Sequence, residues 1–255
     1  MMPLGESGVR RVGRPYITWG LVIINVTVFI ILFTQGPETF NWAIQTFGMK
    51  PHDLFLGRNM YTVVTSMFLH GSLSHLMGNM LYLLVFGSSV ESRLGKIRYL
   101  VMYFASGILA SIIHSLIELL FSEPIVIYGP LGYSVIDPLS IPAVGASGAI
   151  SGILGAYLLL FPNVTLNVFT TIGFFPLVVR VPAIVFIGSW FFYQLYLGIL
   201  SLALPIPYFS GVAFWAHIGG FLGGIFLVPL VGGRRRKLKV RTDIMGRRWY
   251  EIPVE

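Results

Sequence analysis

A series of apolar segments recurs along most of the length of this chain. A helix needs about 20 apolar residues to cross the hydrocarbon core of a bilayer. Hydrophobic residues make up 55% of the 255 residues and charged residues only 11%, a balance that excludes a soluble globular domain. We therefore predict an all-α, polytopic membrane protein in which six spanning helices form one bundle. The six apolar segments lie at roughly 16–35, 74–92, 97–121, 145–161, 180–203 and 211–231.

A seventh apolar segment, at 164–179, is rich in β-branched residues and is interrupted by Gly173 and Pro176, which argues against a spanning helix. The distribution of charge supports the same count. With six spans, 15 of the 17 Lys and Arg residues fall on one side of the membrane, and only Lys50 and Arg58 fall on the other. Cytoplasmic connections carry the excess of these residues. We therefore predict that both termini are cytoplasmic.

On this interpretation the chain has a cytoplasmic N-terminal segment (1–15), a membrane domain (16–231) and a basic cytoplasmic tail (232–255). Three arginines before the first apolar segment imitate the start of a signal peptide. The segment is longer than an ordinary signal-peptide core and has no clear small-x-small cleavage site, so we expect a retained first span. The tail most simply anchors the topology, and binding to anionic lipid headgroups is the alternative.

Polar residues within the apolar segments are the candidate functional residues, because polar groups are costly in lipid. Ser147 opens the fourth segment and His217 lies in the sixth. A serine hydroxyl is a weak nucleophile that needs a base, usually histidine. On the second segment, His75 and Asn79 are four residues apart, so both project from one helix face and can donate hydrogen bonds to an oxyanion. Free backbone N–H groups at the start of the fourth helix favour the same negative charge.

Small residues line the fourth and sixth segments beside Ser147 and His217. Membrane helices approach closely where small residues recur every four positions. We therefore predict that the two helices meet closely enough for the Ser147 hydroxyl to reach the His217 imidazole, as proton transfer requires. The small residues are Ser147, Gly148, Ser151, Gly152 and Gly155 on the fourth segment and Gly220 and Gly224 on the sixth.

Three motifs in this chain resemble those of the rhomboid intramembrane serine proteases. They fall in the expected order on the second, fourth and sixth spans, and the resemblance covers about 16–231. The motifs are His70-(x4)-His75-(x3)-Asn79, Gly145-Ala146-Ser147-Gly148 and Ala216-His217-(x2)-Gly220-(x3)-Gly224.

The resemblance implies a rhomboid-like six-helix bundle with a Ser-His dyad. In it Ser147 would be the nucleophile, His217 the general base, and His75, Asn79 and the Ser147 backbone N–H the oxyanion hole. His70 would fix a loop near the site rather than catalyse. The residues with a structural role near the site would be His70, Gly145, Gly148, Gly220 and Gly224.

Two positions depart from the family pattern. Many rhomboids carry a Trp-Arg pair shortly before the first histidine, where this chain has Tyr61-Thr62. Some members also have an aromatic residue four positions after the nucleophile, which packs on the catalytic histidine, and here that residue is Ser151. These changes bear on how the first loop is anchored and how His217 is oriented. Neither removes a reacting group.

The implied activity is that of a serine endopeptidase which cleaves transmembrane protein substrates in or near their membrane segments. One alternative is an inactive relative that binds membrane clients. A transporter or channel with a histidine proton relay would be expected to show inverted repeats or intramembrane acids, and neither is evident. A soluble α/β-hydrolase is excluded by composition and because Ala149 breaks the G-x-S-x-G motif.

Cofactors and other partners are not indicated by the sequence. Because cysteine is absent, disulfides, thiolate metal sites and a cysteine nucleophile are excluded. His75 and Asn79 lack the second histidine of a zincin motif, so we expect no metal. We expect a multi-pass protein of a prokaryotic cell membrane that contacts membrane lipids and transmembrane substrates but no nucleic acid. The oligomeric state stays open.

We expect access to Ser147 from the non-cytoplasmic side, since the fourth span begins there after three crossings. The connection at 201–211 lies on that side, just before His217. Its Pro205, Pro207 and Gly211 make a continuous helix improbable, so we predict a lid over the dyad. Cysteines introduced at Phe209 or Ser210 should then react with impermeant thiol reagents added outside.

Overall fold

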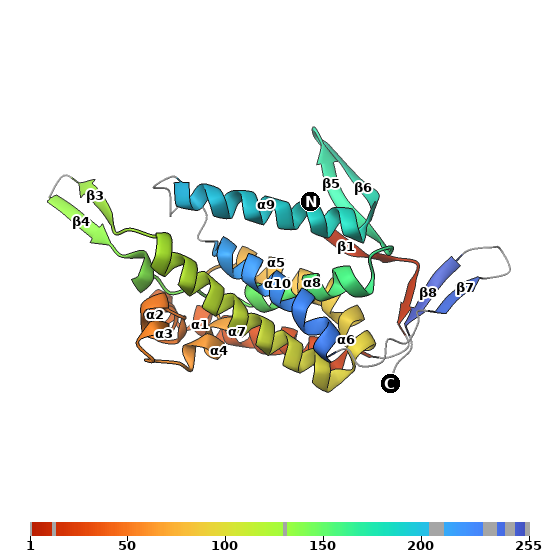
Figure 1. Ribbon diagram of the computed structural model, residues 1–255, viewed down its shortest axis with the longest axis horizontal. Coiled ribbons are helices and arrows are strands. Elements are labelled where there is room, and N and C mark those ends of the chain that lie inside the picture. The colour runs from red at the N-terminus through yellow and green to blue at the C-terminus, as the bar shows by residue number, and fades with distance from the viewer. Residues whose placement is uncertain are drawn as a thin grey trace.

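The computed structural model describes residues 2–11, 14–129, 132–203, 212–231, 239–242 and 248–252. Most of these residues are helical (Figure 1). Five stretches of these described residues are long and apolar enough to cross a membrane. They are α1 (Tyr16–Thr34), the rod Leu73–Leu94, α7 (Lys96–Phe121), α9 (Ala183–Ala203) and α10 (Phe214–Val231). The rod consists of α5 (Leu73–Tyr82), the π-helical turn η2 (Leu83–Gly87) and α6 (Ser88–Leu94).

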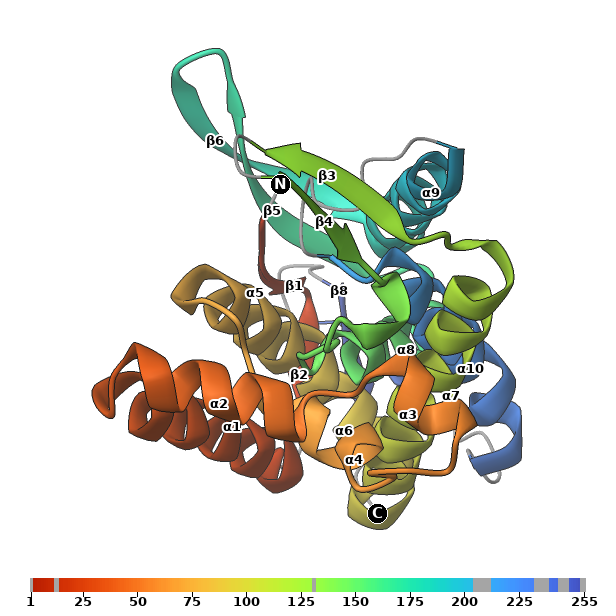
Figure 2. The same cartoon turned by 90° about the vertical axis from the view of Figure 1, so that its left-hand side faces the viewer.

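The sixth apolar helix of the described residues, α8 (Ser147–Leu160), has 14 residues. Together the six helices coincide with the six predicted segments to within a few residues, so the predicted polytopic helical membrane fold is confirmed. Seen along the bundle, α8 lies between α5 on one side and α7 and α10 on the other (Figure 2). Its residues from Ala149 to Tyr157 are all buried. Because protein surrounds this helix, it does not need the length of a lipid-facing span.

Both the interior and the outer faces of the helical bundle are apolar. The interior is filled by large side chains that are almost completely buried. They include Phe86, Tyr99, Tyr103, Tyr157 and Phe161. The outer faces of the helices are also apolar, with exposed side chains such as Phe33, Phe192, Phe226 and Leu230. An apolar exterior of this kind is what a helix facing lipid requires.

The chain before α5 forms a structured loop on the bundle. It contains α2 (Pro37–Phe47), α3 (Pro51–Phe55), α4 (Thr62–Thr65) and η1 (Ser66–Phe68). The Tyr61 ring contacts Phe47 edge-on, and the Tyr61 hydroxyl donates to the Thr46 carbonyl at 3.4 Å. Thr65 donates to the Phe47 carbonyl at 2.8 Å. These contacts anchor the loop in this chain, where many rhomboids have a Trp-Arg pair.

Small β-structures lie outside the helical bundle and were not predicted from the sequence. In the described residues they form three sheets. The first is β1 (Met2–Ser7), β5 (Thr165–Ile172) and β6 (Phe175–Pro182), the second is β2 (Val9–Arg11), β8 (Arg248–Ile252) and β7 (Lys239–Thr242), and the third is β3 (Ile125–Gly129) with β4 (Gly132–Ile136). The segment 164–179 that we rejected as a seventh span thus lies mainly in the β5–β6 hairpin.

Strand pairing also groups the connections at the two ends of the bundle. β1 pairs antiparallel with β5, and β2 pairs parallel with β8. The described parts of the N-terminal segment and of the tail therefore lie at one end, together with the connection between α8 and α9. The β3–β4 hairpin projects from the opposite end (Figure 1). There the short helix η3 (Pro138–Ser140) precedes α8, and a backbone bridge joins Met49 to Ala143.

Candidate active site

Ser147 is the first residue of α8. The chain enters α8 from the β3–β4 hairpin and η3, so Ser147 lies on that side of the bundle. Gly145, two residues before Ser147, has a φ of 124°, a conformation that residues with a Cβ rarely adopt. The Gly145 N–H donates to the Ser66 carbonyl at 2.9 Å. Ser147 is thereby held where the free N–H groups of a helix N-terminus gather.

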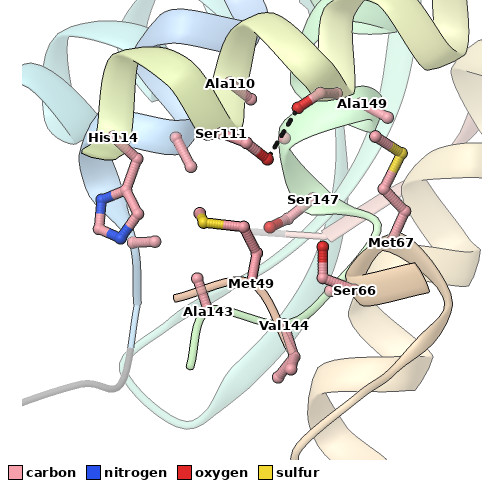
Figure 3. A pocket seen from close by; sticks show the side chains of 15 residues that line it. Met49, Ser66, Met67, Ala110, Ser111, His114, Ala143, Val144, Ser147 and Ala149 are labelled. Carbon is pink, nitrogen blue, oxygen red and sulfur yellow. Dashed lines mark hydrogen bonds between the residues drawn. The ribbon is translucent and has the colours of Figure 1, made fainter. Parts of the chain in front are cut away.

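A pocket of about 40 Å³ opens beside Ser147 (Figure 3). Its polar lining comes from Ser66, Ser111, His114 and Ser147, and most of the remaining lining is apolar or glycine. One buried water needs about 10–15 Å³ of such space. The pocket therefore has room for two or three waters next to the serine, in an otherwise apolar part of the bundle.

His75 and Asn79 lie directly against the backbone that leads into Ser147. A Cβ placed on Gly145 would lie 2.8 Å from His75 Nε2 and 3.6 Å from Asn79 Nδ2. The Ser72 side chain caps α5 by accepting from the His75 N–H at 3.1 Å, and the helix then presents both side chains. Asn79 is buried, and its Nδ2 has no hydrogen-bond partner among the described residues. Two side chains that can donate hydrogen bonds thus lie against Gly145, two residues before Ser147, and the Asn79 amide has no acceptor among the described residues.

The backbones of α8 and α10 are in contact below the serine. A Cβ on Gly220 would lie 2.0 Å from the Gly148 carbonyl oxygen, and one on Gly224 would lie 1.9 Å from the Gly152 oxygen. Only glycine permits an approach this close. The contact brings the first turns of the two helices together, where Ser147 and His217 lie. The described part of the chain nevertheless contains no hydrogen bond between these two side chains.

His217 is instead contacted by two residues of α9 that the sequence analysis did not single out. Its Nδ1 lies 2.8 Å from the Oε1 atom of Gln194. The Trp190 ring packs near the imidazole, with 6.0 Å between centroids and 35° between planes. Ser151 does not take part, because its hydroxyl donates to the Ser147 carbonyl at 2.7 Å. The sequence does contain an indication that Gln194 is functional, because it is the one amide side chain in the apolar helix α9 and polar groups are costly in lipid.

His70 is 2% exposed, and neither ring nitrogen has a hydrogen-bond partner among the described residues. Its ring meets that of His75 edge-on at 5.1 Å between centroids. Burial, and to a smaller extent the neighbouring His75, lowers the pKa of His70 to about 3. His70 is therefore neutral at physiological pH and packs behind His75.

The two remaining histidines, His114 and His52, each lie beside an acidic side chain. His114 Nδ1 is 3.7 Å from Glu118 Oε1, which lies one helical turn further along α7. The position of His114 at the wall of the Ser147 pocket was not predicted. His52 is exposed beside Asp53. Among the described residues, no group of three or more His, Cys, Asp or Glu is arranged to hold a metal ion.

The predicted lid falls outside the described part of the chain. Residues 204–211 are not described. They contain Pro205, Pro207, Phe209, Ser210 and Gly211. The lid and the labelling of these positions stay predictions.

Comparison with known proteins assigns the family. The model of the rhomboid domain matches residues 57–234, which is more than half of the chain. The chain belongs to the rhomboid family. It is 27% identical to the rhomboid protease GluP of Bacillus subtilis (strain 168) over 227 residues, covering 89% of this chain and 37% of GluP.

Other rhomboid relatives come from a plant and from a second bacterium. This rhomboid is 30% identical to the rhomboid-like protein 16, chloroplastic, of Arabidopsis thaliana, covering 74% of this chain and 54% of the relative. It is 29% identical to the rhomboid protease AarA of Providencia stuartii, covering 84% and 72%. The chain thus spans about a third to a half of the length of the first two relatives. With its apolar helices, it is an integral membrane protein of this family.

Proposed function

We propose that this rhomboid is an intramembrane serine endopeptidase that cleaves transmembrane proteins in or near their membrane segments. One observation carries the proposal: the His75 and Asn79 side chains converge on the backbone before Ser147, and the Asn79 amide has no acceptor among the described residues. A buried donor without an acceptor is costly, so its presence calls for a functional explanation. An oxyanion formed by attack of Ser147 is an acceptor that this geometry suits.

In the proposed reaction the Ser147 Oγ attacks the carbonyl carbon of the scissile peptide bond while His217 Nε2 takes its proton. The carbonyl oxygen becomes an oxyanion that accepts from His75, Asn79 and the Ser147 backbone N–H. When the intermediate collapses, the C–N bond breaks and His217 gives the proton to the leaving amine. An acyl ester on Ser147 remains.

Hydrolysis of this ester needs water inside an apolar bundle. The pocket beside Ser147 has space for two or three waters and a polar lining. A water from this pocket would attack the ester carbon while His217 takes its proton, and His217 would return that proton to the Ser147 Oγ when the ester C–O bond breaks. The products are the second peptide, with a new carboxyl end, and free Ser147.

One observation favours a second candidate function. The described residues contain no hydrogen bond between Ser147 and His217, which suits a rhomboid-like protein that binds membrane clients without cleaving them. Hydrogen bonds of a dyad are often long before substrate binds, so the geometry does not exclude catalysis. Reactivity of the serine distinguishes the two functions.

The test is covalent labelling with a serine-reactive fluorophosphonate probe in detergent-solubilised protein, together with cleavage of a transmembrane test substrate. We expect labelling of the native protein, and loss of both labelling and cleavage in Ser147→Ala and in His217→Ala. The double variant should be no worse than either single one, because nucleophile and base act as a unit. Ser151→Ala, one turn along α8, is the matched control that should still be labelled. Cleavage by Ser147→Ala at the native rate would disprove the serine mechanism.

A further inference from the structure

A Ser-His dyad has no third residue that orients the histidine, so another group must hold the catalytic base in position. A neutral imidazole carries its proton on one of its two nitrogens. The hydrogen bond that one nitrogen makes decides which of the two is protonated. To accept a proton from Ser147, His217 must have its Nε2 lone pair free. The usual third group of a triad, an acid that binds Nδ1–H, was not found in the sequence.

The Gln194 side chain lies next to His217 Nδ1, where the acid of a triad would lie. It is buried, with 7% of its surface exposed, and its Oε1 lies 2.8 Å from His217 Nδ1. An amide oxygen only accepts hydrogen bonds. His217 Nδ1 must therefore carry the proton and donate it to Gln194, which leaves the Nε2 lone pair available as the base.

Trp190 holds the same imidazole from a second direction. It precedes Gln194 by four residues, so both side chains project from one face of α9. The face of α9 thus supplies both a hydrogen-bond acceptor and an aromatic contact. In this chain these contacts replace the aromatic residue that some rhomboids have four positions after the nucleophile, where the Ser151 hydroxyl donates to the Ser147 carbonyl of its own helix.

We propose that Gln194 is a positioning residue that, with Trp190, fixes the tautomer and orientation of His217. The proposal rests on the proposed function of Ser147 and His217. After proton transfer the imidazolium still donates its Nδ1–H to the Gln194 carbonyl dipole, which stabilises the charge while it exists. A buried carboxylate in this place would bring a permanent charge into the membrane, whereas an amide brings none. A neutral acceptor is therefore the form of third group that suits an apolar bundle.

The test compares Gln194→Leu and Gln194→Glu with the native protein and with Ser189→Ala. Ser189 lies on the same helix and is exposed, and among the described residues its hydroxyl bonds only the Phe186 carbonyl, so its replacement is the matched control. Two quantities are measured between pH 5 and 9: the kcat and KM for a transmembrane test substrate, and the rate of fluorophosphonate labelling, which does not depend on how that substrate docks.

Gln194→Leu should lower kcat and the labelling rate by about 10- to 100-fold, the effect of losing a hydrogen bond to a charged group, and should leave KM nearly unchanged. Gln194→Glu keeps an acceptor and should retain more activity than Gln194→Leu. Its carboxylate favours the protonated imidazole, so the acid limb of its pH–rate profile should move to higher pH. Among the described residues, the other titratable groups acting on His217 are His75 of α5 and His114 of α7, and both are unchanged in these variants.

Native kcat and a native pH profile in Gln194→Leu would overturn the proposal. If that variant does not fold, an unshifted profile in Gln194→Glu has the same meaning. A defect confined to KM would assign Gln194 to substrate docking and would equally overturn it. Failure of the proposed function is seen separately, as labelling or cleavage that survives Ser147→Ala.

Discussion

At the scale of single residues, the site contains a donor that the described fold leaves unpaired. The Asn79 amide nitrogen is buried without a partner, which costs a folded protein about 1–3 kcal/mol. Its neighbour His75 lies against the same glycine. In the proposed mechanism both groups find their acceptor only when the oxyanion forms, so the cost in the ground state becomes stabilisation of the transition state.

We predict that Asn79→Ala lowers kcat by about 10²- to 10³-fold, the usual effect of losing one oxyanion donor. The same variant should be as stable as the native protein or more stable, because it removes an unsatisfied donor. His75→Ala should lower kcat to a similar extent. The measurements are kcat and KM on a transmembrane substrate and the Tm in detergent. A change in KM alone would instead indicate that these residues position substrate or pack helices.

A second prediction concerns pH and His70. Its pKa is about 3 in the folded protein, against 6.5 ordinarily, because it is buried beside His75. Between pH 6.5 and pH 3, His70 is protonated in the unfolded chain but neutral in the folded protein. The free energy of unfolding therefore decreases as the pH falls through this range. The Tm of the native protein should therefore drop more between pH 7 and pH 4 than that of His70→Phe. Parallel Tm curves would contradict the prediction.

The candidate nucleophile and base could be found from the sequence because polar residues are rare in apolar segments and therefore conspicuous. The partners of His217 could not be found in the same way. Trp190 and Gln194 precede it by more than twenty residues, and the apolar pattern of their helix is nearly the same on every face. Which face of α9 meets α10 is decided by packing in three dimensions.

At the scale of elements, the contact between α8 and α10 holds the two halves of the site together. Its closeness depends on glycines that could be identified by their spacing. The strand β1 is a contrasting case, because it pairs with a connection more than 150 residues away. Its Glu6 accepts from Ser89 at 2.7 Å and from Tyr157 at 2.6 Å. Such long-range pairing leaves no periodic signal in the sequence, and it was missed.

We predict that Gly224→Ala destabilises the protein by about 1–3 kcal/mol and reduces cleavage. A methyl group there would lie 1.9 Å from the Gly152 oxygen, a backbone atom that cannot move without shifting α8. The two helices must therefore separate, and Ser147 moves away from His217. Gly188→Ala on α9 is the control, since a Cβ there meets nothing within 4 Å. A native Tm and native kcat in Gly224→Ala would show that the contact is looser than described.

At the scale of the whole molecule, strand pairing and the count of charges group the same segments together, and the orientation of the bundle in the membrane stays a prediction. The sheets place the N-terminal segment, the β5–β6 hairpin and the described part of the tail at one end of the bundle. The count of Lys and Arg, which uses no structure, groups the same segments and predicts that they are cytoplasmic. Ser147 begins α8 at the other end, so water would reach it from outside.

This topology can be tested with cysteines, because the chain has none. Val135 on β4 and Thr242 on β7 are both exposed and lie at opposite ends of the bundle (Figure 1). In intact cells, an impermeant thiol reagent should modify Val135→Cys, whereas Thr242→Cys should react only after the membrane is permeabilised. Phe209→Cys and Ser210→Cys should behave like Val135→Cys, since their connection leads into the first turn of α10 beside Ser147. The unmodified chain is the control for background labelling. Labelling of Thr242→Cys from outside, with protection of Val135→Cys, would invert the topology and place the water route to Ser147 on the cytoplasmic side.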